Sequence, residues 1–121
     1  MTGRDCLRQA MSLLNYTDDR AGGMPGGTIY RHALAYVNQI AAQLWYAEHS
    51  APFAPLTALE NAVPLSDEAA RTVLPYGVAM LLAAAAGDAD NQTLYAALFD
   101  GRRCAVRGEC RIEDRLPEVS E

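Results

Sequence analysis

Residues 72–87 read TVLPYGVAMLLAAAAG and form the longest apolar run of the chain. The run is shorter than the roughly 18 apolar residues from which a membrane-spanning helix is inferred, so it favours a helix inside a protein core. Pro75 lies within it, where the ring crowds the preceding turn and a backbone N–H is missing. We therefore expect a kink or a restart of the helix at this proline.

Helix signals flank the apolar run on both sides. Upstream, Ser66 offers a capping hydroxyl, and Asp67 and Glu68 place carboxylates beside the positive end of the helix dipole. Downstream, Gly87 tolerates the left-handed conformation that commonly closes a helix. These signals predict helical structure over residues 66–86, interrupted at its proline.

A longer amphipathic helix is predicted over residues 28–49. Thr28 can cap its first turn, and polar residues occupy the faces that its apolar stripe leaves open. The stripe consists of Ala33, Val37, Ile40, Ala41, Leu44 and Ala47. Residues 50–55 then form an extended, proline-spaced crossover. The apolar residues between 56 and 63 either form one helical turn or pack as an irregular lid.

The start of the chain predicts a short helix and a loop. Residues 4–15 place apolar side chains at helical spacing, which indicates a short amphipathic helix. Four glycines and a proline follow within residues 22–27, and this composition cannot hold a helix or a central strand. We therefore expect a flexible glycine-rich loop over residues 16–27.

A last helix is predicted after Gly87. Asp88 or Asp90 caps it, and its apolar residues are Leu94, Tyr95, Leu98 and Phe99. Gly101 weakens this helix by about 1 kcal/mol without ending it. The periodic pattern fades further along, so residues 108–121 are expected to be a C-terminal segment with a loose acidic tail.

The predicted fold is all-α. No stretch of the sequence alternates apolar and polar residues as a half-buried strand does, and no internal repeat is present. The 121 residues are enough for one modest core, so a single domain over 1–121 is expected. We predict a small irregular bundle of four to five helices, with a helical core over 28–107, a Gly-rich loop and a Pro-rich crossover.

Charge and cysteine content narrow the function classes. All ten basic residues are arginine, and 15 acidic residues give a formal net charge of −5. A nucleic-acid binder needs a basic face that releases counterions, so we expect no sequence-specific nucleic-acid binding. The chain opens without the apolar segment of a secretory signal, which predicts synthesis in the cytoplasm without membrane insertion. Cys6, Cys104 and Cys110 lack metal-ligand spacing and are expected to be reduced thiols.

Signals for catalysis, cofactors or metals are weak. The glycine-rich loop lacks the lysine and the preceding strand of a phosphate-binding loop. Residues 88–92 have the alternating acids of a calcium loop, but Thr93 and Phe99 stand where glycine and glutamate are required. His32 and His49 have no second histidine at ligand spacing. We therefore expect no enzymatic activity, no cofactor and no metal site.

Residues suited to contacts between subunits are more frequent. Aromatic residues and arginine are enriched at protein interfaces, although ordinary packing is the alternative for each one. Residues 48–100 carry seven acids and one arginine, whereas five arginines lie within 102–115, so complementary faces can pair copies head to tail. The candidate subunit-interface residues are Tyr36, Trp45, Tyr46, Asp67, Glu68, Arg102, Arg103, Arg107 and Arg111.

Several stretches carry a family resemblance. They are 33–40 (ALAYVNQI), 65–70 (LSDEAA), 74–83 (LPYGVAMLLA), 87–91 (GDADN) and the pair Leu94-Tyr95. Through them the chain resembles small α-helical head-tail connector, or head-completion, proteins of tailed bacteriophages and prophages, from residue 28 to about 107. The resemblance implies a non-enzymatic protein that forms a homo-oligomeric ring and joins the portal protein to the tail or stopper proteins, following portal symmetry. It also implies assembly in the host bacterial cytoplasm and a final place in the virion neck.

A second hypothesis is a small cytoplasmic helical binding module. Its ligand or partner would occupy a groove between the 28–49 and 66–86 helices. Such a module predicts a concave apolar cavity with convergent polar groups. A connector instead predicts a flat surface that contacts a different surface of the next copy.

Overall fold

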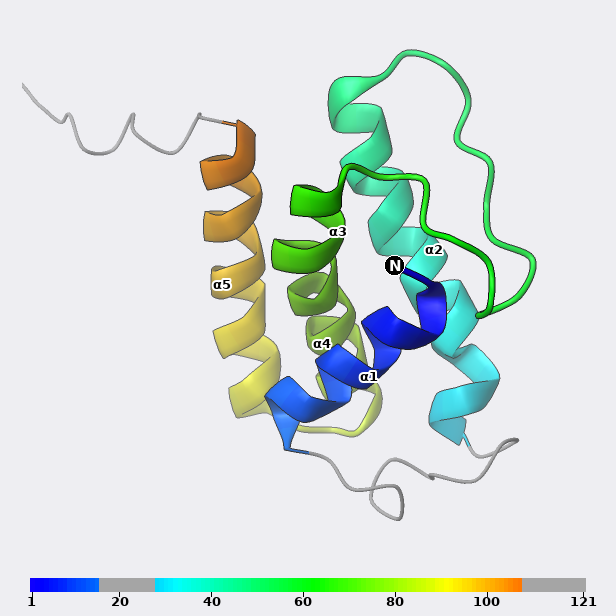
Figure 1. Ribbon diagram of the computed structural model, residues 1–121. Coiled ribbons are helices and arrows are strands. Elements are labelled where there is room, and N and C mark those ends of the chain that lie inside the picture. The colour runs from blue at the N-terminus through cyan, green and yellow to red at the C-terminus, as the bar shows by residue number, and fades with distance from the viewer. Residues whose placement is uncertain (16–27, 108–121) are drawn as a thin grey trace, which may run out of the picture.

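The computed structural model describes residues 1–15 and 28–107, which form five α-helices (Figure 1). They are α1 (Gly3–Leu14), α2 (Thr28–Glu48), α3 (Asp67–Thr72), α4 (Leu74–Ala85) and α5 (Ala89–Arg107). Within these residues the only strand-like pairing is an isolated bridge between Thr2 and Ala62. The prediction of an all-α bundle is confirmed.

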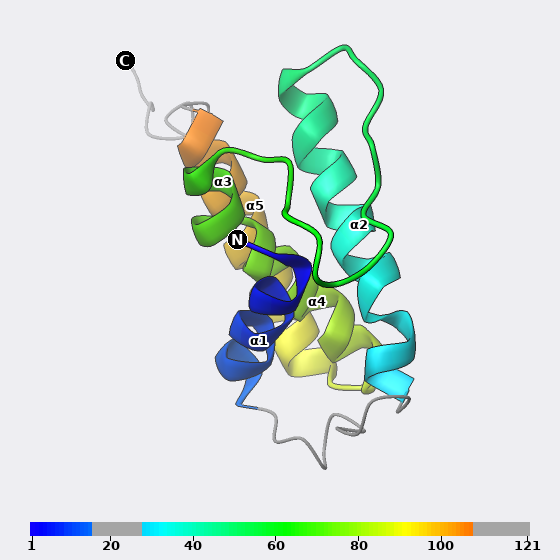
Figure 2. The ribbon, with the colours of Figure 1, turned by 45° about the vertical axis from the view of Figure 1, so that its right-hand side comes forward.

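α4 is the central helix of the bundle. It packs against each of the other four helices, and Figures 1 and 2 show it between α1, α2 and α5. Leu74, Val78 and Leu82 are fully buried, and apolar residues cover its whole circumference. A helix that is apolar all round requires neighbours on every side. The apolar run therefore organises the core, as its composition predicts.

The predicted restart near Pro75 is confirmed as a break between two helices. α3 ends at Thr72, and α4 begins at Leu74. Pro75 therefore stands in the first turn of α4, where a helix needs no N–H from it. At the other end of α3, the Ser66 hydroxyl accepts a hydrogen bond from the Ala69 N–H at 3.2 Å, as expected of a cap.

The turn between α4 and α5 also follows the sequence signals. Gly87 has φ = 73°, the left-handed conformation that a side chain would disfavour. Of the two capping candidates, Asp88 accepts a hydrogen bond from the Asn91 N–H at 3.3 Å. Its second carboxylate oxygen accepts one from the Asn91 side chain at 2.8 Å. Asp88 is therefore the capping residue of α5.

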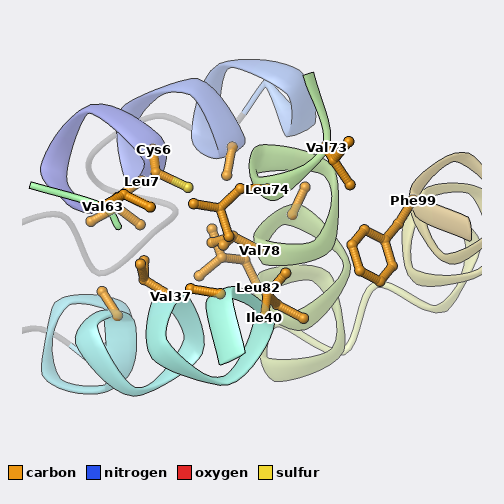
Figure 3. Packing of buried hydrophobic residues seen from close by; sticks show 14 of the residues in the cluster. Cys6, Leu7, Val37, Ile40, Val63, Val73, Leu74, Val78, Leu82 and Phe99 are labelled. Carbon is orange, nitrogen blue, oxygen red and sulfur yellow. The ribbon is translucent and has the colours of Figure 1, made fainter. Parts of the chain in front are cut away.

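α2, α4 and α5 meet at Gly77. A Cβ placed there would lie 2.6 Å from Ile40 Cγ2 and 2.9 Å from Phe99 Cε1, so glycine permits the close approach of all three helices. Figure 3 shows Ile40 and Phe99 reaching the α4 core residues from opposite sides. The predicted α2 stripe is buried except for Ala47, which is half-buried.

α1 is fixed by backbone contacts to residues 59–63. The Gly3 and Arg4 N–H groups donate to the carbonyls of Asn61 and Leu59, at 3.2 and 2.8 Å, and the Val63 N–H donates to the Met1 carbonyl at 2.9 Å. Residues 56–63 are therefore an irregular lid and not a helical turn. Leu56 and Val63, at the two ends of the lid, are buried in the core. The lid is therefore anchored to the bundle at both ends.

Some of the sequence predictions concern residues outside those that the structure describes. The glycine-rich loop over 16–27, the tail over 108–121 and the Thr28 side chain lie outside the described residues. Among the helices that are described, none combines the length and apolar character needed to pass through a bilayer.

Candidate functional site

The aromatic candidates on α2 fasten the proline crossover. Trp45 donates its indole N–H to the Ala51 carbonyl at 2.8 Å, and the Tyr46 hydroxyl accepts the Phe53 N–H at 2.8 Å. The His49 ring stacks on Trp45 with 3.9 Å between ring centroids. Both aromatic residues thus have a role within the chain, although 55% of Tyr46 remains exposed.

Asn38 is a positioning residue that sequence reasoning missed. Its side chain donates to the Leu56 carbonyl at 3.0 Å and accepts from the Leu56 N–H at 2.7 Å. The sequence feature that could have indicated this role is the amide of Asn38 beside the apolar stripe of α2, a position that is half-buried in the structure. Tyr36, the third aromatic candidate, is half-buried against the core with its ring 6.2 Å from that of His32.

The candidate arginines of α5 differ in their surroundings. The Arg102 guanidinium lies over the Tyr76 ring at 4.1 Å from its centroid, a cation–π contact. Arg103 forms an ion pair with Asp100 one turn earlier on the same helix. Arg107 ends α5 and Arg111 follows it, and neither side chain belongs to the described part of the chain.

Three of the predicted interface residues, Asp67, Glu68 and Arg103, belong to one end of the bundle. Arg103 of α5 lines a hollow there together with Glu48 at the end of α2 and Ser66 at the start of α3. Asp67 and Glu68 are exposed on the neighbouring first turn of α3. The hollow holds only about 20 Å³, roughly the room of a single water molecule. This place, where the helices of the binding-module hypothesis meet, is therefore filled by side chains.

A larger concave surface lies between α1 and the α3–α4 junction. It encloses about 480 Å³ and is lined by Arg8, Gln9, Ser12, Leu13, Arg71, Pro75 and Tyr76. A second hollow of about 350 Å³ shares Arg8, Gln9 and Arg71 and adds Met1 and Asp5. We call the two together the arginine groove. Sequence reasoning missed it because the two arginines are far apart in the chain, and only the fold brings them to one surface.

The polar groups around the arginine groove are held in place. Asp5 accepts the Thr2 N–H at 3.1 Å, which lowers the pKa of its carboxyl, and nearby Arg8 acts in the same direction. The Tyr95 hydroxyl donates to the Leu13 carbonyl at 2.7 Å and joins α5 to the end of α1. Burial raises the pKa of Tyr95, and the neighbouring Tyr76 adds to this effect. The charged groups that line the groove are Arg8, Arg71 and the Asp5 carboxylate.

The outward face of α5 carries an exposed apolar stripe. Leu94 is 49% exposed and Leu98 is 37% exposed. Gly101 and Ala105 continue the same face and are also exposed, and a Cβ added at Gly101 would meet no atom within 4 Å. We call these four residues the α5 stripe. Their spacing of four, three and four residues is the pattern of a helix that packs along another helix.

Two observations on the described residues concern metal binding and thiol chemistry. Residues 1–15 and 28–107 contain no group of three or more His, Cys, Asp or Glu side chains that could hold a metal ion. Burial raises the pKa of the Cys6 thiol to about 12, which makes it a poor nucleophile.

The chain was also compared with known proteins. Searches against protein-family models, curated proteins and solved structures found no match.

Proposed function

We propose that this protein is a non-enzymatic subunit of a tailed-phage or prophage head-tail connector, and that it acts by assembling with copies of itself into a ring on the portal protein. The α5 stripe is the observation that carries this function. The stretches that bear the family resemblance fall in helices, since 33–40 lies in α2, 65–70 spans the start of α3 and 74–83 lies in α4.

The α5 stripe suits a contact with another copy. Exposed leucines at successive helical turns give a neighbouring helix an apolar seam. Leu94 and Leu98 are the two large side chains of this seam, and Ala105 extends it toward the end of α5. In a ring, the α5 stripe of one copy packs on a different surface of the next copy. The rotation that relates neighbouring copies then brings the last copy back to the first.

Charge supports the proposed place in the virion. The net charge of −5 and the exposed acids Asp67, Glu68 and Asp90 suit a ring whose channel repels passing DNA. In this proposal the protein assembles in the host bacterial cytoplasm, and its partners are the portal protein and the tail or stopper proteins. Neutralising these three acids should then slow DNA ejection and lower infectivity. If DNA ejection were unchanged, the proposed role of the acids in the channel would be wrong, whereas the proposed ring would still stand.

The ring is tested by native mass spectrometry at high protein concentration, alone and with portal protein. We expect an oligomer for the natural chain and its loss in Leu98→Glu, because a charge in the seam is costly to bury. Gln39→Glu, an exposed position on α2, is the matched control and should assemble normally. A strict monomer that ignores portal protein would overturn the proposal, as would a ring that tolerates Leu98→Glu.

A further inference from the structure

Arg8 and Arg71 reach the arginine groove from α1 and α3 without a carboxylate partner across it. Within residues 1–15 and 28–107, neither guanidinium has an ion pair within 4 Å. Asp5, the acid that lines the groove, is occupied in the α1 capping box with Thr2. Two arginines and the single carboxylate of Asp5 line the groove on a chain of net charge −5, so the groove is net positive and attracts an incoming anion.

The shape of the arginine groove indicates which class of anion it can bind. The hollows of about 480 and 350 Å³ share Arg8, Gln9 and Arg71, so they form one trough with the arginines in its middle. A site for a small molecule usually buries most of its ligand, whereas this trough is open along its length. An extended segment of a protein chain fits such a surface better than a compact metabolite does.

Hydrogen-bonding groups continue along the trough. Gln9, Ser12 and Tyr76 line it together with Arg8. The Arg102 guanidinium lies over the Tyr76 ring, which brings a third positive charge close to one of the lining residues. Guanidinium groups bind carboxylates through two parallel hydrogen bonds, which gives both affinity and orientation.

We propose that the arginine groove binds an extended acidic peptide segment of another protein chain, with its carboxylates on Arg8 and Arg71. This surface is distinct from the α5 stripe, so it goes beyond assembly of the ring. A sequence of suitable charge exists in the protein itself, since residues 108–121 contain five acids and two arginines.

The binding is tested by fluorescence anisotropy with the full chain. The probe is a labelled peptide with the sequence of residues 108–121, and its companion has every acid replaced by the corresponding amide. We expect the acidic peptide to bind at least tenfold more tightly than its neutralised form, and to weaken as salt is raised. Arg8→Gln and Arg71→Gln should each reduce affinity about tenfold or more.

Arg4→Gln is the matched control, because Arg4 also lies on α1 but pairs with Glu60 outside the arginine groove. An equal loss of affinity in Arg4→Gln would overturn the site, since binding would then follow overall charge. Full competition by millimolar inorganic phosphate would also overturn it in favour of a small-anion site.

A variant of the full chain controls for competition between the labelled peptide and the protein's own residues 108–121. In this chain the acids Glu109, Glu113, Asp114, Glu118 and Glu121 are changed to amides. Tighter peptide binding by this chain than by the natural one would support the site. Absence of binding by both chains would overturn it, while the ring could still form through α5.

Discussion

Gly77 and Gly101 are both helical glycines, yet they mark opposite kinds of surface. A Cβ at Gly77 would lie 2.6 Å from Ile40 and 2.9 Å from Phe99, whereas a Cβ at Gly101 would meet nothing within 4 Å. At Gly77 the missing side chain allows three helices to pack closely. At Gly101 a Cβ would meet no atom of the described residues, and the neighbouring Leu94 and Leu98 are exposed. Within the part of the chain that the structure describes, α4 is therefore tightly packed at Gly77, whereas the leucines of α5 remain exposed.

The largest expected effect concerns the chemistry of the sealed interior. Cys6 is fully buried, and its pKa of about 12 compares with an ordinary value of 9.0. At pH 8 the folded protein should hold roughly a thousandfold less Cys6 thiolate than the unfolded chain does. Iodoacetamide labelling followed by peptide mass spectrometry should show this difference between native buffer and urea. Fast labelling of native Cys6 would show that the interior opens readily.

The same thiol links stability to pH. Because folding raises the Cys6 pKa, its contribution to stability is complete below about pH 9 and is lost as the pH rises towards 12. Urea midpoints should therefore fall between pH 8 and pH 10 in the natural protein. They should fall less in Cys6→Ala, which has no thiol to ionise.

Replacing a leucine by alanine should lower the free energy of unfolding by several kcal/mol more in the interior than on the α5 surface. Leu82 has no exposed surface, and Leu82→Ala should lower the free energy of unfolding by about 2–5 kcal/mol. Leu98 is 37% exposed, and Leu98→Ala should cost about 1 kcal/mol or less in the monomer. Urea unfolding measures both variants. Equal losses would mean that α5 is as fully packed as α4.

Gly77→Ala should destabilise the protein, because the new methyl group overlaps Ile40 and Phe99. Overpacking of this kind costs about 1–3 kcal/mol, and the better helix propensity of alanine offsets up to about 1 kcal/mol of it. Urea unfolding should show a net loss. An unchanged midpoint would show that α2 and α5 can move apart at no cost.

Gly101→Ala is the smallest expected change and has the opposite sign. With open space around the position and a helical backbone, alanine should raise the free energy of unfolding by up to about 1 kcal/mol. Urea unfolding of dilute protein tests this value. Gly101→Leu should leave the monomer folded but weaken assembly through α5, and normal assembly would place the contact elsewhere.

Local chemistry explains which features could be predicted from the sequence. Ser66, Pro75 and Gly87 each act within a turn of their own position, so their cap, break and left-handed residue follow from residue type alone. The buried stripe of α2 was likewise visible as a 3.6-residue period. These signals were sufficient for the order of the helices and for a range of four to five in their number.

The remaining features depend on contacts between distant residues. α5 carries Leu94 and Leu98 beside Tyr95 and Phe99, so two neighbouring faces look equally suited to the core. Packing buries Tyr95 and Phe99 and leaves the leucines outside. Asn38 and the arginine groove were hidden for a related reason. Their partners come from other segments, and a single sequence contains no record of that proximity.

The backbone contacts of α1 have a consequence for the order of folding. Twelve residues are too few for a stable isolated helix, and α1 packs mainly on α4, with further contacts to α2 and to residues 59–63. At about 5–20 residues per second, synthesis reaches the end of α4 several seconds after α1 is complete. During that interval Leu7 and Cys6 lack their main packing partner. α1 must therefore dock late in biosynthesis, and a nascent chain that stops before α4 exposes the apolar side chains of residues 3–14 to chaperones.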